Sequence, residues 1–460
     1  MSTTLDRLRR LQALREQRQR GEPAPLAAAS TNRREDWPVA MAGGRIRRLE
    51  ELVPGQVVEN ACGFCYQATS AVPLHHQRGS HALGDLLRLQ PAALAQFHPE
   101  FGLTPAVDFS RAAFIDTETT GLGAGASVYC FMIGVGAFER WEEGTDEPTH
   151  FVVRQLFMRN PAEEGALLLA LAELLAPYTM TVTFNGRGFD LPLLRTRYRY
   201  NRHMLPATGP SGNLLQPDQP HLDLLPPARR LWRRRLQSCR LLNLERSILD
   251  QQRTEDDVPG HLIPQLYSDY LRSGDARDIS RIFYHNREDI ISTAALAERL
   301  SQAFGQGCDP GHTGDLHGLD WLSLGRSYEA RGQLAAAESA YRRALDAMVR
   351  PSERAEAYAA LGQLLKRQGQ WAAAVDTWQQ WLGSVPGDDP TPFVELAKYS
   401  EWQARDLAQA AMWAGWALHN LRRSRNAAQW NTEVQDLEHR LARIQRKLGG
   451  AESSTDIESE

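Results

Sequence analysis

Two carboxylates separated by a single residue give the strongest chemical signal in the sequence. Asp116 and Glu118 follow the apolar residues 112–115 and precede a turn-forming segment at residues 119–123. Side chains two apart on a strand point to the same face, so both carboxylates are expected to converge at the end of a buried strand. They repel each other unless a hard cation lies between them. For the pair taken alone, a polar strand-to-turn transition would be the better explanation.

Two further acids turn the interpretation toward a metal site. Asp190 follows a strand at the mouth of a helix, and Asp289 lies on a helix four residues after His285, on the same face. Four carboxylates that coordinate two divalent ions about 3.5–4 Å apart are the arrangement for two-metal phosphodiester hydrolysis, and a nearby His or Tyr positions or deprotonates the attacking water. The predicted catalytic residues are Asp116, Glu118, Asp190, His285 and Asp289.

Arginine is concentrated between the second and third acidic motifs. Residues 191–246 hold 11 Arg, no Lys and three acids, in a chain whose formal net charge is −4. Phosphates would bind such a patch beside the carboxylates, and nearby aromatic rings could stack on unpaired bases. A solvated helix face with inward-packed aromatics is the alternative, and it is the better explanation for Trp232 alone. The residues predicted to contact nucleic acid are Asn185, Arg229, Arg230, Arg233, Arg234 and Arg235.

The hydrophobic pattern indicates the elements that must hold these side chains. The expected strands are residues 112–116, 127–138, 151–157 and 180–184, and the expected helices are residues 161–176 and 190–198. Strands followed by helix, strand and helix are typical of an α/β domain with a mixed sheet flanked by helices. Residues 206–220, rich in Pro and Gly, are expected to form a surface loop. The signals in residues 45–105 give no assignment.

The C-terminal third repeats itself. The positions with tetratricopeptide spacing are Trp321, Leu324, Gly325, Tyr328, Ala337, Tyr341 and Ala344, and a shift of 37 residues gives Tyr358, Leu361, Gly362, Leu365, Ala374, Trp378 and Trp381. A weaker third pair covers about residues 393–418, and a helix at residues 430–448 is expected to cap the stack. This part is expected to be an all-α tetratricopeptide-like solenoid. Since such arrays offer a concave groove for peptides, a protein partner is expected there.

The composition excludes several classes of protein. With 42% hydrophobic and 23% charged residues, the 460-residue chain is expected to fold into two or three domains. Five cysteines form no disulfide framework, and the N-terminus has no apolar signal region. The most apolar helical stretch, residues 166–176, is too short for a membrane span and contains Glu173. We therefore expect a cytoplasmic protein with no membrane contact.

The acidic motifs occur in the order found in a known family. DTE (116–118), NGRGFD (185–190) and YHNRED (284–289) resemble the three exonuclease motifs of DEDD nucleases. The stretch from about residue 56 to 300 is more similar still to the YprB-like ribonuclease-H-like family, through HLDLL (221–225), LNLE (242–245), DDVPG (256–260) and the same YHNRED. The resemblance implies a ribonuclease-H-like fold and a metal-dependent nuclease site. The metal ligands that it implies are Asp116, Glu118, Asp190 and Asp289.

The third motif departs from the better-known DEDD classes. Those classes place Tyr four residues or His five residues before the Asp, whereas here His285 is at minus four and Tyr284 at minus five. His285 is preferred as the base because it lies one helical turn from Asp289 and titrates near neutrality. The alternative for His285 is a helix residue bonded to the backbone. Glu288 is expected to be a solvated surface acid, and Asp223 either a fifth acid of the site or a structural residue at a strand end.

These inferences give the following organisation and function. The expected domains are a flexible N-terminal helix and linker (1–40), a ribonuclease-H-like nuclease domain (41–305), tetratricopeptide-like repeats with a capping helix (316–449) and a disordered acidic tail (450–460). The expected activity is that of a nuclease dependent on two Mg²⁺ or Mn²⁺ ions, a 3′–5′ exonuclease on single-stranded nucleic acid. DNA and RNA both stay open as substrates. The alternative is a non-catalytic nucleic-acid-binding scaffold with a protein partner at the repeats.

Overall fold

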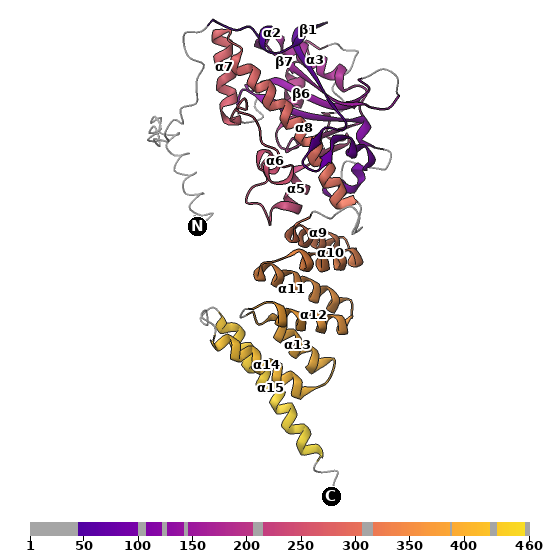
Figure 1. Cartoon of the computed structure of the whole chain (residues 1–460), viewed down its shortest axis with the longest axis vertical. Helices are drawn as coiled ribbons and strands as arrows, with labels where there is room; N and C mark the ends of the chain where they lie inside the picture. Colours follow the sequence, from indigo (N-terminus) through magenta and orange to yellow (C-terminus); the bar gives the residue numbers. More distant parts are fainter. Residues whose placement is uncertain are drawn as a thin grey trace, which may run out of the picture. The chain divides into compact units, whose positions relative to one another are not determined.

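The fold consists of a mixed seven-stranded sheet with flanking helices, followed by a helical region of tetratricopeptide-like pairs (Figure 1). It is seen in a computed structural model, and the predicted fold class is confirmed. The residues that the structure describes are 45–99, 107–121, 127–141, 146–205, 215–305, 316–386, 389–423 and 430–455. The predicted N-terminal helix and linker at residues 1–40 lie outside these ranges.

The sheet has the strand order β1-β2-β7-β6-β5-β8-β9. The strands are β1 (Gly55–Asn60), β2 (Gly63–Pro73), β5 (Ala112–Thr119), β6 (Cys130–Glu139), β7 (His150–Phe157), β8 (Met180–Thr183) and β9 (His221–Asp223). Neighbours from β1 to β5 in this order pair antiparallel, whereas β8 pairs parallel to both β5 and β9. The four expected strands correspond to β5 to β8. The hairpin of β1 and β2 was not predicted, because its half-buried edge lacks a regular alternation of apolar and polar residues.

The helices of this part surround the sheet. They are α2 (Leu49–Leu52), α3 (Glu164–Leu175), α4 (Asp190–Tyr200), α5 (Leu225–Trp232), α6 (Leu241–Ile248), α7 (Ile263–Ser273) and α8 (Arg277–Gly305). The long helix α8 packs against β5, β6 and β7, and α3 packs against β1, β2 and β7 (Figure 1). The expected helices at residues 161–176 and 190–198 correspond to α3 and α4. A short two-stranded sheet, β3 (Gln77–Arg78) with β4 (His81–Ala82), lies outside the main sheet.

Two glycines allow α8 to lie close against β6. A Cβ atom on Gly134 would overlap the side chains of Ile290 and Asn286, and one on Gly136 would overlap Ile290 and Phe151. Side chains at these two positions would push the helix away from the sheet. The absence of side chains at these two positions of β6 therefore determines how close α8, with its residues that face β5, lies to the sheet.

A buried ion pair near the C-terminal end of α4 anchors this helix to α3. Arg197 on α4 is fully buried and donates two hydrogen bonds of 2.5 Å to the carboxylate of Glu164 on α3. Asn201 donates a third bond, of 2.9 Å, to the same carboxylate. Because breaking such a pair leaves an uncompensated buried charge, it holds α4, and with it Asp190 at the helix N-terminus, in a defined position.

The C-terminal region forms helix pairs in the predicted order. Its helices are α9 (Gly318–Ala330), α10 (Leu334–Ala347), α11 (Pro351–Arg367), α12 (Trp371–Ser384), α13 (Thr391–Trp402), α14 (Leu407–Arg423) and α15 (Asn431–Thr455). Gly325 and Gly362 leave room for the rings of Tyr341 and Trp378, as the repeat pattern predicts. Helix α15 packs on α14 and continues to Thr455, so the predicted tail from residue 450 begins inside this helix. Residues 456–460 lie outside the described ranges.

The sheet region and the repeats are in direct contact. Helix α5 packs against α9, and residues of both regions share one hydrophobic cluster. Arg235 forms a 2.9 Å ion pair with Asp320 on α9, and Arg234 pairs with Glu356 on α11. Among the described residues, no helix is both long and apolar enough to cross a membrane.

We predict that Gly134→Ala lowers the free energy of unfolding by about 1–3 kcal/mol, because the added methyl group overlaps Ile290 and Asn286. The measurement is urea denaturation followed by circular dichroism. Gly415→Ala on α14 is the control, since a Cβ there meets nothing within 4 Å and alanine favours the helix by up to about 1 kcal/mol. Equal urea midpoints for Gly134→Ala and the wild type would contradict the close approach of α8.

Candidate functional site

The structure brings the four predicted acids together at one end of the sheet. Asp116 and Glu118 lie on β5, Asp190 is the first residue of α4, and Asp289 lies on α8. Burial, followed by the charges of Asp289, Glu118 and Asp190, raises the pKa of Asp116 well above its ordinary value. Three elements that are distant in sequence therefore deliver carboxylates to one partly buried place.

Burial also raises the pKa values of two further carboxylates, Glu118 and Asp190. Burial raises the pKa of Glu118 to about 8, although the neighbouring His285 lowers it. Burial also raises the pKa of Asp190 to about 6, despite a 2.5 Å hydrogen bond from the hydroxyl of Thr117 that stabilises its charged form. The ionised cluster is thus short of positive charge. Hard divalent cations prefer such oxygen donors, so the donor chemistry of the set suits a cation of this class.

Each of three carboxylates also has a protein partner. Asn286 donates a 2.8 Å bond to Asp116, Thr117 bonds Asp190, and the guanidinium of Arg253 forms an ion pair with Asp289. In the described part of the chain, no three His, Cys, Asp or Glu side chains are gathered closely enough to hold a metal ion as they stand. Metal binding by the four acids would therefore require Asp289 to be shared with, or released from, Arg253.

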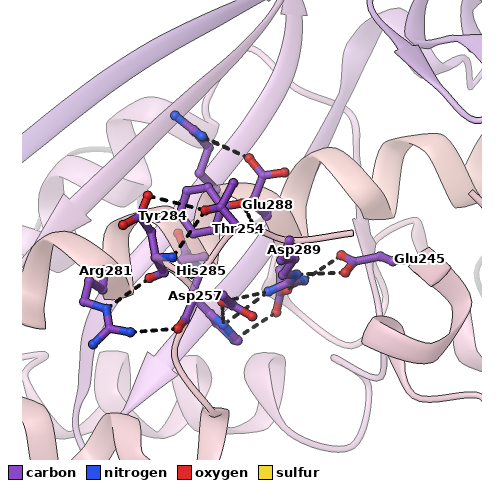
Figure 2. Close-up of polar contacts among 12 residues, drawn as sticks. Glu245, Thr254, Asp257, Arg281, Tyr284, His285, Glu288 and Asp289 are labelled. Atoms are coloured by element: carbon purple, nitrogen blue, oxygen red, sulfur yellow. Dashed lines mark hydrogen bonds and ion pairs between the residues drawn. The ribbon is translucent and has the colours of Figure 1, made fainter. Parts of the chain in front are cut away.

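His285 faces the acidic cluster from α8. Its Nε2 atom lies 3.6 Å from Oδ2 of Asp289 and 3.9 Å from Oε1 of Glu118. Its Nδ1 atom lies 2.7 Å from Oδ1 of Asp257 (Figure 2), so its partner is a side chain and not the backbone. Burial lowers the pKa of His285, but the carboxylates of Asp289, Asp257 and Glu118 outweigh this and raise it to about 9.

Tyr284 and Glu288 of the third motif face away from the acidic cluster. The hydroxyl of Tyr284 accepts a 3.1 Å bond from the backbone N–H of Thr254, and its ring lies under the guanidinium of Arg287 at 5.4 Å. The geometry thus favours His285 over Tyr284 for a chemical role. Glu288 is 7% exposed and forms a 2.7 Å ion pair with Arg78, so the expectation of a solvated surface acid was wrong. The charge of Arg78, which is distant in the sequence, makes this burial possible.

Arg253 was missed by the sequence analysis. Its side chain is 7% exposed, and it donates bonds of 2.8 and 2.6 Å to both carboxylate oxygens of Glu245. The same guanidinium pairs with Asp289 and lies 3.4 Å from Asp257. Glu245 and Asp257 belong to the LNLE and DDVPG segments, which were noted as family features without a role. The sequence feature that could have indicated the contacts of Arg253 was therefore the presence of these two segments.

Asp223 has a structural role beside the site. It is 3% exposed and accepts backbone N–H bonds from Asn185, Arg187 and Leu225 at 2.7, 3.1 and 3.0 Å. These bonds hold the segment between β8 and α4, in which Asn185 has a left-handed φ of 70°. Of the two alternatives for this acid, the geometry favours the structural one. Asp223 thereby positions Asn185 and, further along the same segment, Asp190.

The arginines of the basic segment divide into two groups. Arg229 and Arg233 line a pocket of about 670 Å³ together with Asn185 and Arg240, and none of the described residues that line it is acidic. Arg230 is exposed on the same helix. Arg234 and Arg235 instead pair with acids of the repeats, as described above. Trp232 is 2% exposed, in agreement with its expected place in the core.

Comparison with known proteins agrees with this architecture. Residues 113–301 match the RNase H superfamily, and residues 321–355 match the tetratricopeptide repeat. The chain thus carries an RNase H superfamily domain followed by tetratricopeptide repeats. It is similar to the uncharacterized protein YprB of Bacillus subtilis (strain 168), with 26% identity over 391 residues that cover 84% of this chain and 86% of the relative. The predicted resemblance is confirmed.

We predict that Glu118→Gln raises the free energy of unfolding by about 1–2 kcal/mol at pH 8 in the presence of a chelator. Between pH 4.5 and about 8, folding raises the proton occupancy of Glu118, so the wild type loses stability as the pH rises through this range. The glutamine cannot ionise, so its advantage should grow from pH 4.5 to 8 and vanish at lower pH. Thermal denaturation across this pH range measures the difference in stability between the variant and the wild type. A difference that does not depend on pH would contradict the raised pKa of Glu118.

Proposed function

We propose that this chain is a divalent-metal-dependent nuclease that hydrolyses phosphodiester bonds by a two-metal mechanism, acting as a 3′–5′ exonuclease of the DEDD type on single-stranded nucleic acid. The observation that carries the proposal is the convergence of Asp116, Glu118, Asp190 and Asp289 on an RNase H superfamily fold. Burial, together with the charges of neighbouring acids, raises the pKa values of Asp116, Glu118 and Asp190, and the described side chains compensate the negative charge only in part. A fold alone would not support the proposal, but this donor set beside an arginine-lined pocket does.

The carboxylates and His285 have different roles in the proposed reaction. The four carboxylates would hold Mg²⁺ or Mn²⁺, which supply activation of a water molecule and stabilisation of the leaving oxygen. Nε2 of His285 faces the same place and is assigned the proton of the attacking water. Because the carboxylates raise the pKa of this imidazole to about 9, compensation of their charge lowers it toward neutrality, where it can accept a proton.

The substrate strand is assigned to the arginine-lined pocket. Asn185 lines this pocket and belongs to the segment that leads to Asp190, so one segment connects the pocket with the carboxylates. Arg229, Arg230 and Arg233 are exposed and have no acidic partner within the described ranges. Binding of phosphate by Arg234 and Arg235 stays a prediction that requires them to share or leave Glu356 and Asp320.

The partner and location stay predictions. A second pocket of about 650 Å³ lies between α11, α12 and α13 and is lined by Pro351, Trp381, Val385 and Pro392 among others. An apolar pocket between repeat helices supports the prediction of a protein partner there. The cytoplasmic location rests on the sequence expectation alone.

A non-catalytic nucleic-acid-binding protein is the second candidate. The observation that favours it is the ion pair of Arg253 with Asp289, since a guanidinium already neutralises one of the four acids. In that case the arginine-lined pocket would bind nucleic acid and the carboxylates would only support the fold. Cleavage assays separate the two candidates.

We predict that the wild type degrades labelled single-stranded DNA or RNA with Mg²⁺ or Mn²⁺, and that Asp116→Asn lowers kcat by at least about 10²-fold. Asn at this position preserves the shape of the side chain and can still accept the bond from Asn286. Substrates labelled at either end show the polarity in the product ladder. Absence of cleavage by the wild type on every substrate, with salt-dependent binding retained, would favour the second candidate.

We also predict that the double substitution Arg229→Ala and Arg233→Ala raises the Kd for a single-stranded oligonucleotide and lowers the slope of log Kd against log salt by about 0.7 per lost phosphate contact. Fluorescence anisotropy at several salt concentrations measures both quantities. Arg234→Ala is the comparison, and we expect a smaller effect because its guanidinium pairs with Glu356. If the Arg234→Ala variant changes the Kd and the salt dependence as much as the double variant does, the nucleic-acid strand contacts all of these arginines and not only those of the pocket.

A further inference from the structure

We infer that Asp257 is a positioning residue of the proposed nuclease: it binds Nδ1 of His285 and thereby turns Nε2 toward Glu118 and Asp289. Asp257 belongs to the DDVPG segment, to which neither the sequence motifs nor the proposed function assigns a role. The inference rests on the proposed function, and it concerns how the imidazole is held and not which residues bind metal.

The hydrogen bond from His285 decides which ring nitrogen is available for chemistry. Nδ1 lies 2.7 Å from Oδ1 of Asp257, and it also lies 3.2 Å from Nη1 of Arg253. A guanidinium can only donate, and Nδ1 cannot donate to Asp257 and accept from Arg253 at once. The shorter contact joins groups of opposite character, so Nδ1–H donates to Asp257. This bond fixes the ring orientation and leaves Nε2 directed at the two acids.

The segment that carries Asp257 is fastened to the same turn of α8 as His285. The guanidinium of Arg281 donates to the backbone carbonyls of Glu255, Asp256 and Asp257 at 3.1–3.2 Å. The hydroxyl of Tyr284 accepts the backbone N–H of Thr254 at 3.1 Å. Figure 2 shows Arg281, Tyr284 and His285 side by side on α8, with Thr254 and Asp257 facing them. Tyr284 thus helps to position Asp257, the acid that orients His285.

A second contact limits the movement of Asp257. Arg253 lies 3.4 Å from Oδ1 of Asp257, and both its remaining nitrogens bind Glu245, which is 1% exposed. The carboxylate of Asp257 is therefore held between an arginine and an imidazole. It has little freedom to turn into the acidic cluster as a further metal ligand. This arrangement resembles the outer partners that orient catalytic and metal-binding histidines, whose loss typically reduces activity by about 10–100-fold.

The test is a double-mutant cycle on the whole chain with a single-stranded oligonucleotide and Mn²⁺. We expect Asp257→Ala to lower kcat by about 10–100-fold with KM unchanged. In the His285→Ala background, assayed at high enzyme concentration, the same substitution should have no further effect, because Asp257 acts through the imidazole. Asp256→Ala is the matched control, since the adjacent acid is exposed and makes no contact with His285, and it should keep the activity of the wild type.

Two results would overturn the inference. If the decreases in kcat caused by Asp257→Ala and His285→Ala multiply in the double variant, Asp257 acts independently of His285. Loss of the Mn²⁺-induced rise in Tm in Asp257→Ala would show that the residue serves the metal site instead. Retention of that rise, together with the lowered kcat, supports a positioning role.

A spectroscopic readout keeps this test separate from the proposed function. A downfield proton resonance from the Nδ1–H of His285 should be present in the wild type, absent in His285→Ala and lost or shifted in Asp257→Ala. A wild type without nuclease activity would refute the proposed function while this resonance still reports the contact. Absence of the resonance from the wild type would overturn the inference even in an active enzyme.

Discussion

Mutual repulsion among buried carboxylates is the constraint on which the rest of this domain depends. Negative groups gathered away from water oppose folding unless other parts of the chain compensate them. The supporting elements can be understood as that compensation: Asn286 and Thr117 bond two of the acids, and Arg253 pairs with a third. Helix α8 supplies Asn286, His285 and Asp289 together, and it reaches β5 only because β6 carries glycines at the point of contact.

The compensation is arranged in layers. Arg253 is itself held by Glu245, and Asp223 holds the segment that leads to Asp190, so each group near the acids is oriented by a partner farther out. Such outer partners fix the orientation of the groups that face the site. They also explain why the segments that include residues 221–225, 242–245 and 256–260 accompany the acidic motifs in one chain. None of them carries a predicted ligand, yet each supplies a supporting carboxylate.

Much of this arrangement could be predicted from the sequence, and the reasons for the rest are physical. Alternation on β5 predicts that Asp116 and Glu118 share a face, and helical periodicity predicts the same for His285 and Asp289. The hairpin of β1 and β2 gave no periodic signal, because it lies at an edge of the sheet and is only half buried. The role of Arg253 could not be found either. Glu245 and Asp257 are near it in sequence, but Asp289 is 36 residues away, and nothing in the local pattern distinguishes a buried arginine from an exposed one.

The contact between α5 and α9 has a consequence for any attempt to study the two regions apart. Removing the repeats would deprive Arg234 and Arg235 of Glu356 and Asp320, and it would divide a shared hydrophobic cluster. A shortened protein would carry two extra unneutralised guanidinium groups directly after Arg233, which lines the arginine-lined pocket. The repeats therefore neutralise two arginines of the sheet region, and the two regions depend on each other through charge as well as through apolar contact.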